Sequence, residues 1–394
     1  MRILVLSFYY QPDLSAGSFR VTALVDALRQ KILTGSTIDV VTTLPNRYGT
    51  FTVDAPEIES HEGLAVHRIP LPAHKGGILD QSRSFLVFSW RVLGYVASEE
   101  YDVVFATSSR LMTAVLAAWI AQKKNIPLYL DIRDIFVDTI KDVFPRYLAK
   151  IVVPLFGIME RWTINKAIKV NLVSLGFADY FSERYRGKAF TFFTNGIDDE
   201  FVAASYVSAK GISDKRTTIR ALYAGNIGEG QGLHAILPDL ARRVSGKICF
   251  RIIGDGGRKN TLQSALARYG VENVEILPPV SRDQLIREYQ NADVLFLHLN
   301  DYEAFKKVLP SKLFEYAAMG KPIWAGVAGY PAEFMRSEIS NAVVFNPCDA
   351  EEAVRVYEDL VLHVSCRDEF LKKYARNNIM EKMAIAIVDM TKEE

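Results

Sequence analysis

Residues 307–325 read KVLPSKLFEYAAMGKPIWA, and the rest of the chain is organised around this stretch. Pro310 and Ser311 predict the start of a helix, with the Ser311 hydroxyl capping free backbone amides. Gly320 followed by Pro322 predicts its end. The first turn of such a helix offers unpaired N–H groups and the positive end of the helix dipole, which together favour an anion such as a diphosphate. The stretch therefore predicts a short helix with an anion site at its start.

Two side chains on this helix suit a nucleotide. Lys312 adds a formal positive charge beside the predicted anion site. Glu315 follows Ser311 by four residues, so it lies on the same helical face, and its carboxylate can accept hydrogen bonds from the vicinal hydroxyls of a ribose. A phosphate site followed along the helix by a ribose site indicates a nucleotide. The alternative is a structural helix that carries an exposed Lys312–Glu315 pair.

This run resembles the signature helix of the retaining glycosyltransferases of family 4. The resemblance is greatest to the branch that builds bacterial surface polysaccharides such as O-antigen, capsule and exopolysaccharide. In that family a Pro-Ser-Lys-x-x-Glu-Tyr-x-Ala-x-Gly-Lys-Pro run lies against the sugar nucleotide. The resemblance implies the α/β GT-B fold, in which two Rossmann-like domains, each with a doubly wound parallel sheet, face a central cleft.

The same resemblance implies a reaction. A sugar would pass from a nucleoside diphosphate sugar, with a UDP-sugar favoured, to a saccharide or lipid-linked saccharide acceptor. The C-terminal domain would hold the nucleotide and the N-terminal domain the acceptor, and closing the cleft would exclude water. The configuration of the transferred sugar would be retained.

Length and composition are compatible with a two-domain protein that binds no nucleic acid. The 394 residues are long for one core, and 47 basic against 46 acidic residues leave a net charge of +1. The three cysteines, Cys249, Cys348 and Cys366, form no CxxC pair and argue against a zinc site and a disulfide framework. A signal-peptide pattern is absent, and no apolar run reaches the roughly 20 residues of a bilayer span. We therefore expect a cytoplasmic location.

Short apolar runs that alternate with helical patterns predict a parallel, doubly wound sheet in each half of the chain. Strands are expected in the first half at residues 3–6, 38–42, 65–69, 103–107, 127–132 and 170–174. They are expected in the second half at residues 219–223, 248–253, 274–277 and 293–299. Ligands of such sheets bind beyond the carboxyl ends of the strands, so the loops that follow these runs are the places to search for a site.

Three parts of the chain are expected from these patterns. They are an acceptor-binding domain over residues 1–205, a nucleotide-sugar-binding domain over 206–375, and a final helix over 376–394 that crosses back to the N-terminal domain. The turn at residues 195–198, Asn-Gly-Ile-Asp, is similar to the turn that closes the N-terminal domain in the family. The polar residues 207–217 are the expected linker.

Two places in the N-terminal half hold candidate site residues. Gly17 and Ser18 lie at the entrance of the first predicted helix, where their amides are expected to contact a phosphate or the acceptor's leaving oxygen; an ordinary helix cap is the alternative. Residues 131–134, Asp-Ile-Arg-Asp, end a strand. The resemblance implies that Arg133 and Asp134 are catalytic, whereas a structural ion-pair cluster is the alternative.

The second half begins with a glycine-rich turn, AGNIGEGQG at residues 224–232, whose backbone can approach phosphates closely. In the family this turn lies on the donor diphosphate and usually ends in Lys-Gly, but Gln231 stands here in place of the lysine. The nucleobase lies near residues 274–280 in relatives. Besides Ser311, Lys312 and Glu315, the expected donor-binding residues are therefore Gly17, Ser18, Gly225, Asn226, Gly228, Gly254 and Val280.

Lys307 departs from the family pattern, because many relatives carry a glutamate at this position and a second one at the position of Glu315. We expect Lys307 to be catalytic, supplying the charge that Gln231 lacks and balancing the leaving diphosphate in the transition state. With Lys312, Lys307 and the helix dipole carrying the charge, neither a metal nor another cofactor is required. The absence of obvious paired carboxylates favours front-face departure of the diphosphate over double displacement.

Two stretches, residues 84–97 and 141–162, interleave basic and aromatic residues. Such a stripe either lies on an anionic bilayer surface, here the cytoplasmic face of the inner membrane, or forms a core face with snorkelling cations. We favour the core face. His298, within an apolar run, is likewise expected to be a core histidine rather than a base.

Two other classes of function stay open. A GT-B epimerase of nucleotide sugars would bind the nucleotide at Glu315 but would need no acceptor. A non-catalytic scaffold, suggested by Lys307 and Gln231, would bind the sugar nucleotide without turnover. A dinucleotide oxidoreductase is disfavoured, because no GxGxxG with a downstream acid follows the first strand.

Overall fold

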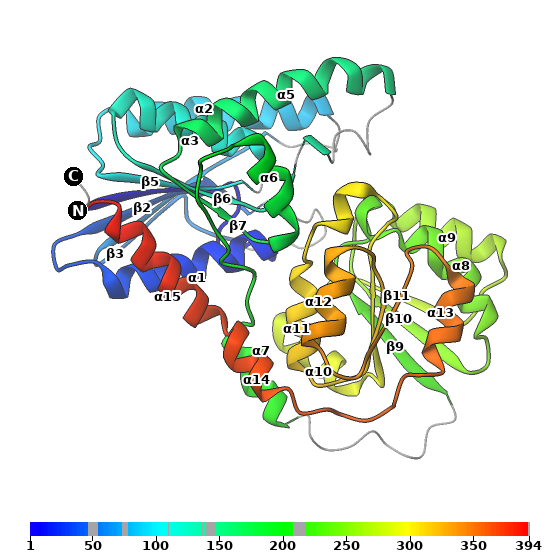
Figure 1. Cartoon of the computed structure of the whole chain (residues 1–394). Helices are drawn as coiled ribbons and strands as arrows, with labels where there is room; N and C mark the ends of the chain where they lie inside the picture. Colours follow the sequence, from blue (N-terminus) through cyan, green and yellow to red (C-terminus); the bar gives the residue numbers. More distant parts are fainter. Residues whose placement is uncertain are drawn as a thin grey trace. The chain divides into compact units, whose positions relative to one another are not determined.

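The computed structural model describes residues 1–45, 54–72, 78–108, 110–135, 137–138, 146–207 and 218–392. The chain divides into two compact units. Unit 1 comprises Met1–Thr194 and Asn377–Glu394, and unit 2 comprises Asn195–Arg376. Each unit is built on one central sheet with helices on both faces (Figure 1). The predicted pair of doubly wound α/β domains is therefore confirmed.

The sheet of unit 1 has the strand order β3-β4-β2-β1-β5-β6-β7-β8. All neighbouring strands are parallel except β3 and β4, which are antiparallel. The order reverses at β1, which pairs with both β2 and β5. The strands are β1 (Arg2–Leu6), β2 (Thr37–Thr43), β3 (Ile58–His61), β4 (Leu64–Ile69), β5 (Val103–Thr107), β6 (Leu128–Ile132), β7 (Lys169–Leu172) and β8 (Phe190–Thr191).

Helices cover both faces of this sheet, which explains why strands such as β1 and β5 are apolar on both sides. One face carries α2, α3 and α5, and the other carries α1 together with α15 from the end of the chain (Figure 1). The helices are α1 (Ala16–Lys31), α2 (Ile78–Val96), α3 (Leu111–Lys124), α5 (Arg146–Lys166), α6 (Ala178–Arg184) and α15 (Arg376–Asp389). A short 3-10 helix, η1 (Leu175–Phe177), precedes α6.

The sheet of unit 2 is parallel throughout, with the order β11-β10-β9-β12-β13-β14. Its strands are β9 (Ile219–Ala224), β10 (Ile248–Ile253), β11 (Val274–Leu277), β12 (Val294–His298), β13 (Ile323–Gly326) and β14 (Ala342–Phe345). Its helices are α7 (Asp199–Val207), α8 (Leu233–Arg243), α9 (Lys259–Arg268), α10 (Arg282–Asn291), α11 (Ser311–Ala318), α12 (Tyr330–Glu338), α13 (Ala350–Tyr357) and α14 (Asp368–Tyr374). The 3-10 helices η2 (Glu229–Gln231) and η3 (Glu303–Lys306) lie in two of its loops.

The core of unit 2 is aromatic on the face covered by α8, α9 and α13. Phe250 on β10, Phe296 on β12 and Trp324 on β13 contact one another ring to ring. Trp324 is fully buried, and its indole N–H donates to the backbone oxygen of Ala353 at 3.0 Å. This bond satisfies the only polar atom of the indole, so the ring can anchor α13 without leaving a buried donor unpaired.

The boundary between the units lies earlier than the expected end of the first domain at residue 205. Ile197 forms a parallel β-bridge with Ala375, and the Arg376 guanidinium pairs with Asp198. These contacts attach the turn at residues 195–198 and the following α7 to unit 2, so the turn opens this unit instead of closing unit 1. The chain returns to unit 1 at Asn377, and residues 208–217 of the expected linker lie outside the described residues.

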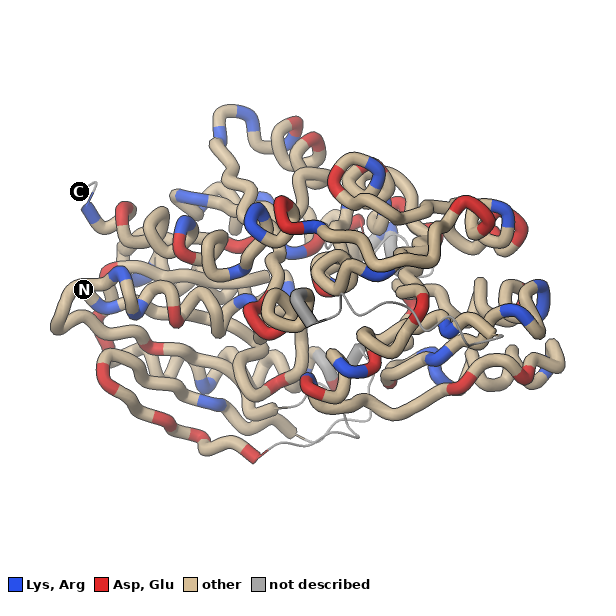
Figure 2. Tube along the Cα trace, turned by 90° about the horizontal axis from the view of Figure 1, so that it is seen from below, with Lys and Arg blue, Asp and Glu red and all other residues tan. Residues whose placement is uncertain are grey.

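The basic and aromatic stretch at residues 84–97 forms most of α2, and its buried stripe is the expected core face. Phe88 and Val92 are fully buried, whereas Leu86 and Trp90 point outward and are 69% and 72% exposed. Of the second stretch, residues 141–145 lie outside the described residues, and Leu155 on α5 is exposed. Lys and Arg are interspersed with Asp and Glu along the described parts of the trace in each unit (Figure 2). Among the described residues, the helices are too short or too polar to span a bilayer.

Candidate active site

The strand order of unit 2 reverses between β9 and β12. Parallel α/β sheets bind ligands outside the carboxyl ends of their strands at such a point. The glycine-rich turn follows β9, and the segment that follows β12 leads to α11. The two segments are hydrogen bonded, because the Asn300 backbone N–H donates to the Gly230 backbone oxygen at 2.8 Å and the Tyr302 hydroxyl donates to the Glu229 carboxylate at 2.6 Å. The fold thus joins the glycine-rich turn to the segment that leads into α11.

The glycine-rich turn is held in shape by its own side chains. Asn226 donates its amide hydrogen to the side-chain oxygen of Gln231 at 2.8 Å, and the same oxygen accepts the Gly228 backbone N–H at 3.3 Å. The Tyr223 hydroxyl donates to the Asn226 backbone oxygen at 2.7 Å. Gln231 therefore braces the turn at the position where relatives place a lysine. This structural role explains why an uncharged amide suits the position.

Gly254 follows β10 and packs directly against the glycine-rich turn. Its N–H donates to Leu277 O at 3.0 Å, and the Gly225 N–H donates to Ile253 O at 2.8 Å. A Cβ atom at position 254 would overlap the Gly225 carbonyl oxygen, at a backbone φ of +158°. Only glycine fits this close approach. Gly225 and Gly254 are thus placed together, as expected, at the carboxyl edge of the sheet.

Helix α11 begins at Ser311, but its cap differs from the prediction. Pro310 is the N-cap residue with extended backbone angles, and no side chain makes a cap hydrogen bond. The Ser311 hydroxyl is therefore not the cap, because Ser311 itself has already entered the helix. Tyr316 ties the helix to the sheet, since its hydroxyl accepts the N–H of Ala224 at 3.1 Å. The uncapped first turn of α11 lies beside the glycine-rich turn, where a Cβ at Gly225 would come 3.1 Å from the Lys312 side chain.

Lys312, Glu315 and Tyr289 form one cluster on α11 and α10. The Tyr289 hydroxyl donates to Glu315 Oε2 at 2.9 Å, and Lys312 Nζ lies 3.3 Å from the same oxygen and 3.2 Å from the Tyr289 hydroxyl. Burial, followed by the nearby Glu315 charge, raises the pKa of Tyr289 well above its ordinary value. The Glu315 side chain is only 12% exposed, so the alternative of an exposed surface pair does not describe these residues.

Two further predicted residues lie on loops of unit 2. Val280 is partly buried and precedes Ser281, whose hydroxyl caps α10 by accepting the Gln284 N–H. Val280 therefore lies in the loop that follows the carboxyl end of β11, the edge at which the glycine-rich turn also lies. Lys307 directly follows η3 and is partly buried.

At Ser18 in unit 1 the structure has the alternative, an ordinary cap, whereas the contact expected at Gly17 stays a prediction. Helix α1 starts at Ala16, with Ser15 as its N-cap. The Ser15 hydroxyl accepts the Ser18 N–H at 3.2 Å, so this amide already has a partner. Gly17 and Ser18 are both buried. Because Ser15 already accepts the Ser18 N–H, this amide is not free to contact the donor, and the prediction for the Ser18 amide is wrong.

Asp131, the first residue of the Asp-Ile-Arg-Asp segment, is structural. It is fully buried and accepts two hydrogen bonds from the Arg20 guanidinium, at 2.8 and 2.9 Å, and a third from the Asn171 amide at 2.8 Å. Burial alone would raise the pKa of Asp131, but the Arg20 charge outweighs burial and the pKa is lowered. Arg20 also donates to the backbone oxygens of Phe193 and Thr194 at 2.7 and 2.6 Å. This buried ion pair joins α1 to the end of unit 1.

Arg133 and Asp134 follow β6 and leave the sheet. The Arg133 N–H donates to the Ser108 hydroxyl at 3.0 Å, which joins the ends of β5 and β6. Although part of the Asp134 residue is exposed, burial of its carboxyl raises the pKa to about 6, and the Arg133 charge only partly opposes this effect. Carboxyl groups with a shifted pKa that lie beyond the C-terminal ends of parallel strands are typical of functional sites.

His298 is the core histidine that its sequence context predicts. It is fully buried, with Nδ1 2.7 Å from the Gln231 oxygen and Nε2 accepting the Cys348 N–H at 3.0 Å. These partners assign the proton to Nδ1. Burial lowers the pKa of His298 to about 4, so the ring stays neutral.

Sequence reasoning missed Arg20, Tyr289 and Tyr316. Each contacts a residue that is distant in the sequence, so no local spacing marks it. A buried charge offered the best signal: Arg20 lies on the buried face of α1 with Val21 and Leu24, and needed a carboxylate partner. Among the described residues there is no group of three or more metal-ligating side chains.

Two protein-family models together match most of the chain. Residues 17–194 match the glycosyl transferase 4-like domain, and residues 209–378 match glycosyl transferases group 1. The putative colanic acid biosynthesis glycosyl transferase WcaI of Escherichia coli (strain K12) is 35% identical over 99 residues. That match covers 25% of this chain and 24% of the relative.

Solved structures show the same architecture. WaaG, a glycosyltransferase involved in lipopolysaccharide biosynthesis, matches with a TM-score of 0.67 and 13% identity over 98% of this chain and 99% of its own. Anabaena Alr3699/HepE in complex with UDP-glucose matches with a TM-score of 0.62 and 16% identity over 100% of this chain and 98% of its own. At such identities the similarity shows the fold, and the GT-B fold is confirmed.

Proposed function

Because this chain belongs to the family 4-type glycosyltransferases of GT-B fold, we propose that it transfers a sugar from a UDP-sugar to a saccharide or lipid-linked saccharide during surface-polysaccharide synthesis. The observation that carries the proposal is the cluster of Lys312, Glu315 and Tyr289 beside the uncapped start of α11. It lies at the point where the strand order of unit 2 reverses, which is where such folds bind nucleotides.

The diphosphate and the ribose of a nucleoside diphosphate sugar have candidate partners in unit 2. The first-turn amides of α11, the dipole of that helix and the Lys312 ammonium favour the diphosphate. Glu315 Oε1 has no protein partner among the described residues and can accept the ribose hydroxyls, while Tyr289 and Lys312 orient the carboxylate through Oε2. The glycine-rich turn lets the phosphates approach its backbone.

The acceptor belongs to unit 1 in this proposal, with the Asp134 carboxylate orienting the attacking hydroxyl. Transfer with retention follows from front-face displacement. The bond between the anomeric carbon and the diphosphate oxygen breaks, the acceptor oxygen bonds on the same face, and its proton passes to the departing diphosphate. Lys312 and Lys307 balance the negative charge that develops on this leaving group, so we propose that no metal is needed. Turnover that survives chelation with EDTA would support this point, and loss of turnover would refute it.

The first test is nucleotide binding by calorimetry, with UDP, GDP, dTDP and CMP compared. We expect saturable binding of UDP, and Glu315→Gln should weaken it roughly tenfold to 100-fold, because a charge-assisted pair of hydrogen bonds to the ribose is lost. Gln retains the shape of Glu, so the fold should persist. Glu338→Gln removes a surface carboxylate that pairs with Lys373 and serves as the control. UDP affinity that is equal in the Glu315→Gln variant and the wild type would refute the donor site.

The pH profile tests Asp134. Since burial raises the pKa of this carboxyl to about 6, it is protonated below that pH, and a neutral carboxyl accepts the hydrogen bond of the acceptor hydroxyl more weakly than a carboxylate does. We therefore expect kcat/KM to fall as the pH is lowered through about 6. Asp134→Asn should lose roughly 100-fold in kcat/KM through misplacement of the acceptor, and should lose the acid limb. Asp179→Asn, an exposed carboxylate on α6, should leave the profile unchanged. An acid limb that persists in Asp134→Asn would contradict the role.

A further inference from the structure

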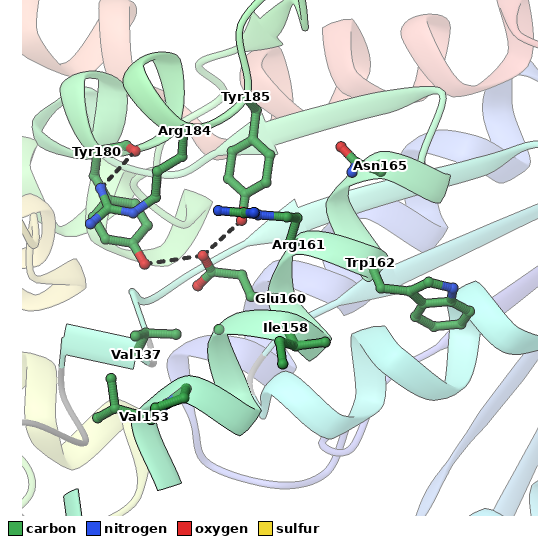
Figure 3. A pocket seen from close by; sticks show the side chains of 12 residues that line it. Val137, Val153, Ile158, Glu160, Arg161, Trp162, Asn165, Tyr180, Arg184 and Tyr185 are labelled. Atoms are coloured by element: carbon green, nitrogen blue, oxygen red, sulfur yellow. Dashed lines mark hydrogen bonds between the residues drawn. The ribbon is translucent and has the colours of Figure 1, made fainter. Parts of the chain in front are cut away.

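A cavity lies wholly within unit 1, between α5 and α6, and has a volume of about 680 Å³ (Figure 3). Pockets for small molecules commonly span about 300–1,000 Å³, so this one can hold a sugar residue or a small oligosaccharide. Its walls combine apolar side chains such as Val153 and Ile158 with charged and aromatic ones. None of the donor-site residues described above contributes to it.

Glu160 is the buried polar group of this cavity. The side chain is 5% exposed, and its Oε1 accepts hydrogen bonds from the hydroxyls of Tyr180 at 3.0 Å and Tyr185 at 2.9 Å (Figure 3). Among the described residues nothing donates to its Oε2. Because Glu160 also lines the cavity, this second oxygen can accept a hydrogen bond from a ligand bound there. Two tyrosines thus hold Glu160 in one orientation while half of its accepting capacity stays available.

Hydrogen-bond donors surround this acceptor. The Arg184 guanidinium lies 3.6 Å from the centre of the Tyr180 ring and donates to the Tyr180 backbone oxygen at 3.1 Å, which fixes its position. Arg161 and Asn165 line the same cavity from successive turns of α5 and are exposed. Neither the Arg161 nor the Asn165 side chain makes a hydrogen bond to another described residue. The cavity therefore offers one accepting oxygen at its base and several donors on its rim.

We propose that this cavity binds a neutral sugar residue of the acceptor, at a distance from the hydroxyl that is glycosylated. The inference rests on the proposed function, and it names a second contact between the enzyme and its acceptor. A sugar hydroxyl both donates and accepts, so it can donate to Glu160 and accept from an arginine or Asn165. An anionic group would face the Glu160 carboxylate, and a cationic one would face two guanidinium groups. A neutral polyol avoids both repulsions.

The position of the cavity supports an acceptor with more than one residue. Val137, which lines it, follows Asp134 by three residues in the chain. The cavity thus adjoins the segment that follows β6, to which we assign the acceptor hydroxyl. In this proposal the saccharide chain extends from Asp134 into the space between α5 and α6.

The test measures binding directly on the full chain by saturation-transfer difference NMR. The probes are the methyl glycosides of glucose, galactose, mannose and N-acetylglucosamine, with glucuronate and choline as charged probes. We expect at least one neutral glycoside to bind, and Glu160→Gln to weaken it at least about tenfold, because the amide NH₂ replaces the accepting oxygen. Arg161→Ala, at an exposed position that leaves the fold intact, should weaken it several-fold. Glu183→Gln on the outer side of α6 is the matched control.

UDP affinity, measured on the same samples, should not change in these variants because the donor residues lie in unit 2. Lack of binding by every neutral glycoside would overturn the inference, whatever UDP does, because the NMR signal does not depend on turnover. Binding that is unaffected by Glu160→Gln and Arg161→Ala, or preferential binding of glucuronate or choline, would overturn it as well. A wild-type protein that does not bind UDP would instead refute the donor site.

Discussion

Arg20→Leu is expected to lower the free energy of unfolding of unit 1 by about 3–5 kcal/mol, because it leaves the fully buried Asp131 carboxylate without its cationic partner. The variant also removes the donors to the backbone oxygens of Phe193 and Thr194. Denaturant unfolding, followed by a probe in unit 1, measures the change. Arg29→Leu on the exposed side of the same helix should change the stability by no more than about 0.5 kcal/mol.

A double variant separates the lost charge pair from lost packing. Arg20→Leu with Asp131→Leu removes both charges, and replacing a buried ion pair by apolar residues is often close to neutral, so part of the stability should return.

The contribution of Asp131 to the free energy of unfolding depends on pH with a defined sign. The pKa of Asp131 is lowered in the folded protein, so its contribution is fully present above the unfolded value of about 3.8 and is lost as the pH falls below it. A loss below about 1 kcal/mol in Arg20→Leu would contradict the structural role.

Lys312→Met is expected to lower kcat roughly 100-fold to 1,000-fold, the range found when one group that stabilises transition-state charge is removed. The ammonium lies in the first turn of α11, beside Gly225, where the leaving diphosphate is proposed to bind. Charge on the diphosphate grows as the bond to the sugar breaks. UDP affinity should therefore fall much less than kcat.

Lys306→Met is the matched control, because this neighbouring lysine pairs with Glu303 at the surface and carries no assigned role. Turnover is measured by UDP release in the presence of an acceptor. A Lys312→Met variant that keeps the kcat of the wild type would refute the assigned role of the ammonium. Binding of UDP-sugar without any turnover in the wild type would favour the scaffold interpretation, and a changed sugar without an acceptor would favour an epimerase.

Local patterns were sufficient for the main elements of the fold. The apolar runs that became β1, β5 and β10 are bounded by polar loops, so their ends are visible in the sequence. The strands β3, β8, β13 and β14 were not expected. They are two to four residues long, and β13 follows Gly320-Lys321-Pro322 so closely that it reads as part of the turn after α11. Short strands are defined by their pairing partner, which no local pattern contains.

In the candidate site, too, local patterns predicted some features and tertiary packing decided others. The residues of α11 were placed correctly relative to one another, because four residues along a helix share a face whatever surrounds the helix. The capping residues were not placed correctly, because Ser15 rather than Ser18 caps α1 and Pro310 rather than Ser311 is the N-cap of α11. A shift of one to three residues at a helix end depends on how the helix packs onto its sheet, and this lies beyond local propensity.

The sequence by itself determined that this chain forms two parallel α/β sheets and that Lys312 and Glu315 share one face of a helix, because hydrophobic period and helix ends are local properties. Tertiary structure alone decided the partners of the buried charges. Tyr289 reaches Glu315 from α10, Arg20 reaches Asp131 across 111 positions, and two tyrosines of unit 1 orient Glu160. Hydrogen bonds require atoms within about 3 Å, and only the folded chain brings residues this distant in sequence so close together.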